Sequence, residues 1–218
     1  MSIPRFKLYL FDIDGTLLDS AEDICSAARQ TLENAGATGL TDSYLRSFIG
    51  YHMHELFSSV FPGISEERSA ELLAAYRAAY LARGHAATRV YEGVPRMLEG
   101  LGGLKSTATT KGSETARNVL AQFGLAGHFD HVQGTDGFPS KPEPDVVLRS
   151  LERFGVAPAE CLLIGDTAPD MEAGRRAGVR TCGVTWGYGD AARMRAHEPD
   201  YWISRPLELA SRADGELL

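Results

Sequence analysis

The chain has 218 residues, of which 44% are hydrophobic and 23% are charged, a composition typical of a folded protein with one sizeable core and a smaller attached unit. Its formal net charge of -7 argues against a nucleic-acid-binding protein, because phosphate backbones are bound by clusters of Lys and Arg. No apolar stretch approaches the ~20 residues that span a membrane, and the N-terminus lacks a signal-peptide pattern, so we expect a cytoplasmic protein without a membrane partner.

Several short apolar runs are predicted to be buried strands of a parallel sheet, because longer amphipathic stretches alternate with them. They cover residues 6–11, 106–109, 131–134, 161–164 and 181–184. Ligands of open α/β sheets bind beyond the carboxyl ends of the strands. The residues that directly follow these runs are therefore the first candidates for catalysis.

The interval between the first two predicted strands has helical periodicity throughout. Helices are predicted over residues 21–34, 42–48, 54–60 and 65–83, and glycines and prolines separate them. The interval is too long for an ordinary β-α-β connection. We therefore interpret residues 17–89 as a helical cap domain inserted into a sheet domain formed by residues 1–16 and 90–218, with hinges near residues 17–19 and 89–93.

Two aspartates follow the first predicted strand, in the segment Asp12-Ile13-Asp14-Gly15-Thr16. Alternation along an extended chain directs both carboxylates to one side. Close carboxylates repel each other unless a cation shares them, which makes Asp12 and Asp14 candidate Mg²⁺ ligands, one of which could also attack a substrate while the other transfers protons. Gly15 permits a sharp turn, and the Thr16 hydroxyl is a candidate phosphate contact. The alternative is a plain polar turn after a strand.

Three further candidates lie beyond later predicted strands. Lys141 precedes a helix predicted over residues 145–154, and its point charge is suited to offset a phosphate and a carboxylate together, although a solvated surface lysine is the alternative. Asp166 and Asp170 follow the strand at 161–164 and supply the oxygen ligands that Mg²⁺ prefers. The alternative for Asp166 is a helix N-cap, and that for Asp170 is to orient a metal-bound water.

Taken in order, these segments resemble the haloacid dehalogenase superfamily, in its phosphatase branch. The resemblance rests on residues 12–16, on Thr109 at the end of the second strand, on Lys141 and on the acidic loop at 165–170. It implies a Rossmann-like α/β core with an inserted α-helical cap, Mg²⁺ as cofactor, and Asp12 as a nucleophile that forms an aspartyl-phosphate. It also implies that Asp14 transfers protons and ligates the metal through its main-chain carbonyl, while Thr109 and Lys141 stabilise the phosphoryl group.

Other segments resemble the phosphoglycolate phosphatases within this family, namely Phe48-Ile49-Gly50 and residues 183–189. The resemblance implies a small phosphorylated metabolite as substrate and a monomer or homodimer. Arg46 and His52 are candidate contacts for an anionic substrate in the cap, with exposed helix side chains as the alternative. Thr110 stands where the family usually has Asn, and it becomes the phosphate contact if the strand register is displaced by one residue.

Other activities of the same fold fit the sequence less well. Dehalogenases need neither Asp14 nor the acidic loop, and phosphonate hydrolases need a cap lysine, whereas residues 17–89 contain none. A phosphotransferase or sugar-phosphate mutase, and a non-catalytic binding protein, stay as alternatives. We predict a magnesium-dependent phosphomonoester hydrolase.

Overall fold

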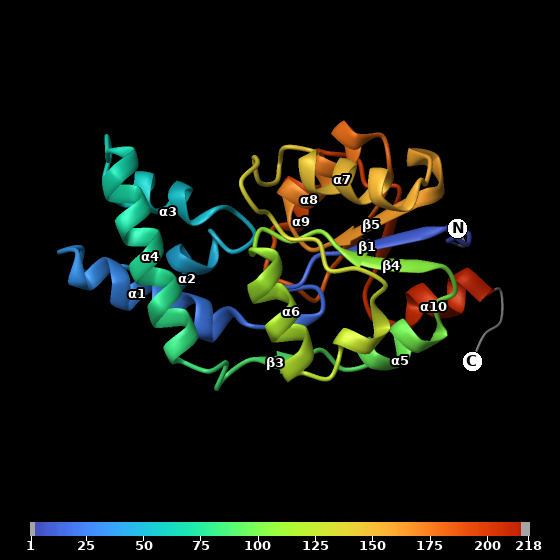
Figure 1. Ribbon diagram of the computed structural model, residues 1–218, viewed down its shortest axis with the longest axis horizontal. Helices are drawn as coiled ribbons and strands as arrows, with labels where there is room; N and C mark the ends of the chain where they lie inside the picture. The colour runs from blue at the N-terminus through green and yellow to red at the C-terminus, as the bar shows by residue number, and fades with distance from the viewer. Residues whose placement is uncertain (1–2, 215–218) are drawn as a thin grey trace.

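A computed structural model describes residues 3–214 of the chain, with side chains for residues 3–210. Its centre is a five-stranded sheet with the order β4-β1-β5-β6-β7 (Figure 1). Each neighbouring pair of these strands is parallel. The strands are β1 (Leu8–Phe11), β4 (Leu104–Thr107), β5 (Cys161–Gly165), β6 (Arg180–Val184) and β7 (Tyr201–Ile203).

Helices cover both faces of this sheet (Figure 1). Tyr9 and Phe11 of β1 belong to the same hydrophobic cluster as residues of α5, α6 and α10, whereas Leu8 and Leu10 pack with α7 and α8 on the other face. A sheet buried on both faces needs apolar residues at consecutive positions, as β1 and β5 have. The predicted α/β fold class is confirmed. These helices are α5 (Val94–Gly100), α6 (Ser113–Gln122), α7 (Asp145–Phe154), α8 (Ala168–Ala177), α9 (Ala191–Arg195) and α10 (Leu207–Asp214), with the short 3-10 helices η1 (Ala126–His128) and η2 (Pro158–Glu160).

Four helices at one end of the molecule share a hydrophobic cluster of their own (Figure 1). They are α1 (Ala21–Asn34), α2 (Asp42–Arg46), α3 (Met53–Val60) and α4 (Glu66–Ala82). The chain leaves and re-enters the sheet region through two short antiparallel strands, β2 (Leu18–Asp19) and β3 (Arg89–Val90), at the positions predicted as hinges. The division of the chain at residues 17 and 89 stays a prediction.

The predicted strand pattern differs from the structure in several places. The strand predicted at 106–109 is β4 at Leu104–Thr107, so Thr109 lies beyond its end. The strand predicted at 131–134 is wrong: His131 makes one isolated bridge to Ser106, and the Gln133 carbonyl accepts a hydrogen bond from the Thr107 hydroxyl at 2.8 Å instead of extending a ladder. The strand β7 was not predicted, because three residues at a sheet edge are too short to show alternation. Among residues 3–214, no helix combines the length and the apolar character needed to cross a membrane.

Candidate active site

Three buried carboxylates meet beyond the carboxyl ends of β1 and β5. These strands are parallel neighbours, so the residues that follow them, Asp12 and Asp166, lie at the same edge of the sheet. Asp170, in the first turn of α8, joins them, and one carboxylate oxygen from each residue lies within 4.8 Å of the others. All of these side chains are almost completely buried. The structure therefore brings together three of the four aspartates predicted as metal ligands, Asp12, Asp166 and Asp170.

Lys141 enters this group from the loop before α7. Its ammonium donates to Asp12 Oδ1 at 2.7 Å and to Asp170 Oδ1, and its side chain has no exposed surface. Burial alone would lower the pKa of Lys141, but Asp12 and Asp170 raise it above its ordinary value. One ammonium thus faces three carboxylates, which leaves two negative charges without a cationic partner in the cluster.

Burial and this excess of negative charge raise the pKa values of two of the carboxylates. Burial raises the pKa of Asp12, and the charges of Asp170 and Asp14 raise it further against the opposing effect of Lys141. Burial together with Asp170 and Asp12 raises the pKa of Asp166 well above its ordinary value. Carboxylates in such a setting ionise together when a cation shares them. The oxygen donors and the charge balance fit a divalent cation such as Mg²⁺, which Asp12, Asp166 and Asp170 would hold.

The side chain of Asp166 is held in position by two glycines that pack against it and by two hydrogen bonds. The Thr16 hydroxyl donates to Oδ1 at 3.0 Å, and the Tyr188 main-chain N–H donates to Oδ2 at 2.8 Å. A Cβ atom at Gly15 would lie 2.2 Å from Asp166 Oδ2, and one at Gly187 would lie 2.3 Å from the same oxygen. Only glycine fits at these positions. The Thr16 hydroxyl, predicted as a phosphate contact, is thus directed to Asp166.

Asp170 also has a local structural role. Its Oδ2 accepts from the main-chain N–H of Thr167 at 3.0 Å, which makes Thr167 rather than Asp166 the N-cap of α8. The helix therefore holds Asp170 so that its other oxygen faces Lys141. Asp166 is left free of a capping role.

The carboxylate of Asp14 turns away from the other three. Ser20 Oγ donates to its Oδ1 at 2.5 Å, and Lys111 Nζ lies 2.9 Å from its Oδ2. Burial would lower the pKa of Lys111, but Asp14, Tyr80 and Tyr76 raise it well above its ordinary value. Asp14 therefore faces a cavity on the side of the four helices, and its carboxylate is separate from the three-carboxylate group.

Thr109 and Thr110 follow β4, next to the end of β1. Thr109 is fully buried, and its hydroxyl accepts from the Lys111 main-chain N–H at 3.3 Å. Thr110 is partly exposed and lines the cavity that Asp14 faces. The structure thus places Thr109 towards the sheet and Thr110 towards the four helices, and the choice of phosphate contact between them stays a prediction.

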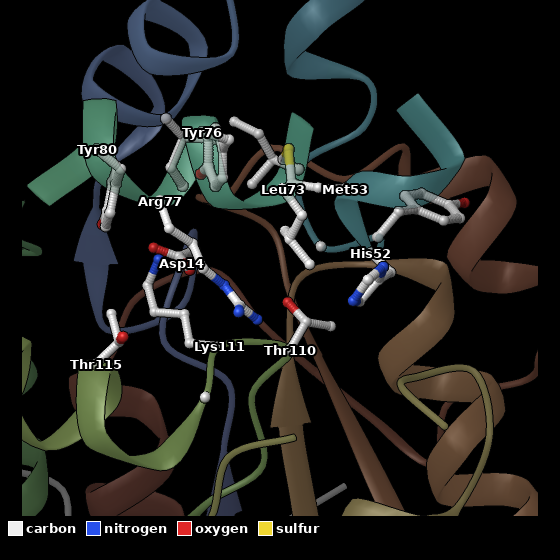
Figure 2. A pocket seen from close by; sticks show the side chains of 15 residues that line it. Asp14, His52, Met53, Leu73, Tyr76, Arg77, Tyr80, Thr110, Lys111 and Thr115 are labelled. Atoms are coloured by element: carbon white, nitrogen blue, oxygen red, sulfur yellow. Dashed lines mark ion pairs between the residues drawn. The ribbon is translucent and has the colours of Figure 1, made fainter. Parts of the chain in front are cut away.

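This cavity, here named the cap-side pocket, lies between α4 and the segment that follows β4 (Figure 2). Its volume is ≈ 90 Å³. His52 lines it, as predicted for a substrate contact, whereas Arg46 is exposed at the end of α2 and is absent from its lining. His52 Nδ1 accepts from the His54 main-chain N–H at 3.2 Å, and burial lowers the pKa of His52, so the neutral ring carries its proton on Nε2. The lining also includes Asp14, Leu73, Tyr76, Arg77, Tyr80, Thr110 and Lys111.

Several residues of this site were not found from the sequence. Lys111 directly follows the predicted threonines, and its position there was the available signal. Leu73, Tyr76, Arg77 and Tyr80 recur at the spacing of one helix face, and this periodicity predicts a shared face without showing that the face lines a pocket. Ser20 and Tyr188 had no local signal, because their partners lie elsewhere in the fold.

Comparison with known proteins identifies the family of this chain. Residues 9–184 match the model of the haloacid dehalogenase-like hydrolases. The chain belongs to this family. The phosphoglycolate phosphatase of Aquifex aeolicus is 34% identical over 216 residues, which cover 97% of this chain and 99% of that protein. The pyrophosphatase PpaX of Bacillus velezensis is 33% identical over 213 residues, which cover 96% of this chain and 97% of that protein.

The solved structures agree with the sequence relatives. A structure named a predicted phosphatase, from Clostridium acetobutylicum, superposes with a TM-score of 0.88 at 27% identity, covering 95% of this chain and 98% of that chain. The family, the fold and the relatives identify this protein as a hydrolase of the phosphatase branch, similar to the phosphoglycolate phosphatases. The predicted resemblance is confirmed. The names of the relatives include different substrates, so the substrate is a separate question.

Proposed function

We propose that the protein is a magnesium-dependent phosphomonoester hydrolase that acts on a small phosphorylated metabolite through an aspartyl-phosphate on Asp12. The observation that carries this proposal is the group of three buried carboxylates that faces one buried ammonium. Such a group holds two excess negative charges, which a divalent cation balances. Mg²⁺, when bound there, would supply positive charge that offsets the phosphoryl oxygens.

Asp12 is proposed as the nucleophile because Lys141 holds one of its oxygens in place at 2.7 Å. In the first step, a carboxylate oxygen of Asp12 forms a bond to phosphorus while the bond from phosphorus to the leaving oxygen breaks. The Lys141 ammonium offsets the combined negative charge of the phosphoryl oxygens, Asp12 and Asp170. In the second step, the oxygen of a water molecule attacks phosphorus, which releases inorganic phosphate and restores Asp12.

Asp14 is proposed to transfer the protons of both steps. Its carboxylate lies outside the group of three and lines the cap-side pocket, which is where a leaving group would lie. It would give a proton to the leaving oxygen in the first step and accept a proton from the attacking water in the second. Ser20 and Lys111 would orient it through contacts with its two oxygens.

The helices α1–α4 are proposed to act as a cap over this site. They contribute His52 and several α4 residues to the pocket that Asp14 faces. A cap in this position would exclude bulk water and contact the leaving group, so it would set substrate preference. Phosphoglycolate heads the candidates because several relatives carry that name.

The test is steady-state phosphate release from phosphoglycolate, pyrophosphate and a nucleoside 5′-monophosphate, with Mg²⁺ and with a chelator. We expect release that requires Mg²⁺ in the wild type and falls by about 10³-fold or more in Asp12→Asn, because the attacking oxygen is lost. Circular dichroism of the variant controls for folding. Release that persists in a folded Asp12→Asn variant would contradict the nucleophile, and phosphoryl transfer without release would favour a mutase.

A further inference from the structure

One face of α4 brings polar groups into the cap-side pocket. Leu73, Tyr76, Arg77 and Tyr80 recur at helical spacing and all line the cavity. Figure 2 shows the Arg77 side chain directed from α4 towards Thr110 and Lys111 of the sheet domain. This face therefore lies opposite the position where Asp14 would meet a leaving group.

Arg77 is an exposed cation that lines the pocket. Among residues 3–210, whose side chains are described, it makes neither an ion pair nor a hydrogen bond. Lys111, the other cation of the pocket, is already paired with Asp14 at 2.9 Å. Burial lowers the pKa of His52, so that residue brings no charge at neutral pH. The pocket thus has one positive charge available for a ligand.

Tyr80 supplies a second observation, independent of Arg77. Its side chain is 4% exposed, and its hydroxyl has no acceptor among the described residues, because the nearby Lys111 ammonium can only donate. The Lys111 ammonium lies 4.5 Å from the centre of the Tyr80 ring, so it contacts the ring face. Burial raises the pKa of Tyr80, which keeps the hydroxyl protonated as a donor. A buried donor without an acceptor is unfavourable, and an acceptor on a ligand would relieve this cost.

We propose that Arg77 and Tyr80 bind a second anionic group on the leaving group, so that the enzyme prefers short phosphomonoesters with an anion on their tail. Either a carboxylate or a second phosphate has the required acceptor oxygens and charge. The cavity volume of ≈ 90 Å³ suits a short tail. This inference rests on the proposed function and assigns specificity to residues that do not take part in the chemical step.

The test compares substrates that differ in the charge of the tail. Phosphoglycolate has a carboxylate, pyrophosphate has a second phosphate, and 2-hydroxyethyl phosphate has a neutral tail of similar size. We expect Arg77→Gln to lower kcat/KM for the preferred anionic substrate by about 10–100-fold, the effect of losing a charged hydrogen bond, and to change it less than about twofold for 2-hydroxyethyl phosphate. The ratio of the two anionic substrates in the wild type distinguishes a carboxylate from a phosphate tail.

Two further variants separate binding from folding. Tyr80→Phe should lower kcat/KM for the same anionic substrate by about 3–10-fold, since a neutral donor is lost. Arg68→Gln is the matched control, because Arg68 lies on the same helix, pairs with the exposed Glu71 at 2.7 Å and is absent from the lining of the pocket. An equal loss on all three substrates in Arg77→Gln, or no loss on any, would overturn the proposal.

A binding experiment keeps this inference distinct from the proposed function. Calorimetry of phosphoglycolate and of pyrophosphate with Asp12→Asn in Mg²⁺ measures affinity without turnover. Adding Arg77→Gln should weaken binding of the preferred anion by about 10–100-fold. If the wild type releases no phosphate but binding depends on Arg77, the proposed hydrolase is contradicted and the anion site is supported. If the wild type releases phosphate but binding does not depend on Arg77, the hydrolase is supported and the anion site is contradicted.

Discussion

The end of the sheet and the cap-side pocket differ in how completely their polar groups are paired. At the end of the sheet, Asp12 and Asp170 share the Lys141 ammonium, and Asp166 accepts from Thr16 and Tyr188. On the helical side, Arg77 makes no ion pair among the described side chains, and the buried Tyr80 hydroxyl has no acceptor there.

This difference agrees with the roles proposed above, in which the sheet side carries out the chemistry and the helical side selects the substrate. Groups that must stabilise a phosphoryl transition state gain from being fixed before the substrate arrives, since no reorganisation is then needed during the reaction. Groups that recognise a tail gain from being unpaired, because a ligand then completes hydrogen bonds that the free protein lacks. We therefore expect changes on the sheet side to reduce activity towards every substrate and to lower stability.

The largest effect is expected for Lys141→Met, which leaves buried Asp12 and Asp170 without their ammonium. In Mg²⁺-free buffer the free energy of unfolding should fall by about 3–5 kcal/mol, the cost of breaking a buried ion pair. Phosphate release should fall by at least about 10²–10³-fold for all substrates. Urea denaturation and phosphate-release assays measure the two effects.

Lys7→Met is the matched control for this change. Lys7 pairs with Glu160 at 2.6 Å, but its side chain is 68% exposed, whereas that of Lys141 is 0% exposed. An exposed pair contributes less than about 1 kcal/mol. If Lys141→Met destabilises the protein no more than Lys7→Met does, the ion pairs of Lys141 do not hold the polar groups at the end of the sheet in place.

A smaller effect is expected for Gly187→Ala, which tests the position of Asp166. The added Cβ would lie 2.3 Å from Asp166 Cβ and Oδ2, so the carboxylate must shift. Because Asp166 is proposed to hold Mg²⁺, its displacement should weaken Mg²⁺ activation by about 10–100-fold, measured as the Mg²⁺ concentration for half-maximal phosphate release. Gly127→Ala, which has no heavy atom within 4 Å of its Cβ, should leave this value unchanged. Equal Mg²⁺ requirements in both variants would show that Asp166 does not hold the metal.

The smallest effect is expected for Tyr188→Phe, which tests the connection between the two sides. The Tyr188 hydroxyl accepts from the main-chain N–H groups of Ser20 and Ala21 at 2.6 and 3.0 Å and donates to Asp19 at 2.7 Å. The side chain of Ser20 makes no capping hydrogen bond at the start of α1, and the Tyr188 hydroxyl takes this role instead. Its loss should reduce the free energy of unfolding by about 0.5–2 kcal/mol, as loss of a helix cap does.

Activity separates this connecting role from a purely structural one. Because Ser20 orients Asp14, kcat should fall several-fold in Tyr188→Phe while the Mg²⁺ requirement is retained. Tyr44→Phe is the matched control, since the Tyr44 hydroxyl contacts only the exposed Ser59, at 2.7 Å. Equal kcat values in both variants would mean that the Tyr188 hydroxyl does not help to position Asp14.

Features with a local physical cause were predictable from the sequence. The bounds of α1 and α7 agree with the predicted ranges of 21–34 and 145–154, because apolar spacing and helix-ending residues specify them locally. The motif at residues 12–16 placed two carboxylates and a turn directly after a strand, and the strand order confirms that position. The strand predicted at 131–134 failed because its apolar pattern was short and its carbonyl at Gln133 bonds to a side chain.

Partnerships across the fold could not be predicted in this way. The sequence by itself determined the fold class, the family and the acidic residues that follow β1 and β5, because strand pattern and motif spacing are local properties. Only the tertiary structure decided that Asp14 turns to Ser20 and Lys111 and that Arg77 lines the same pocket without an ion pair to any side chain among residues 3–210. The physical reason is that a charge is satisfied by whichever group the packing of helices and sheet brings within a few ångströms, and that distance is set by the whole fold.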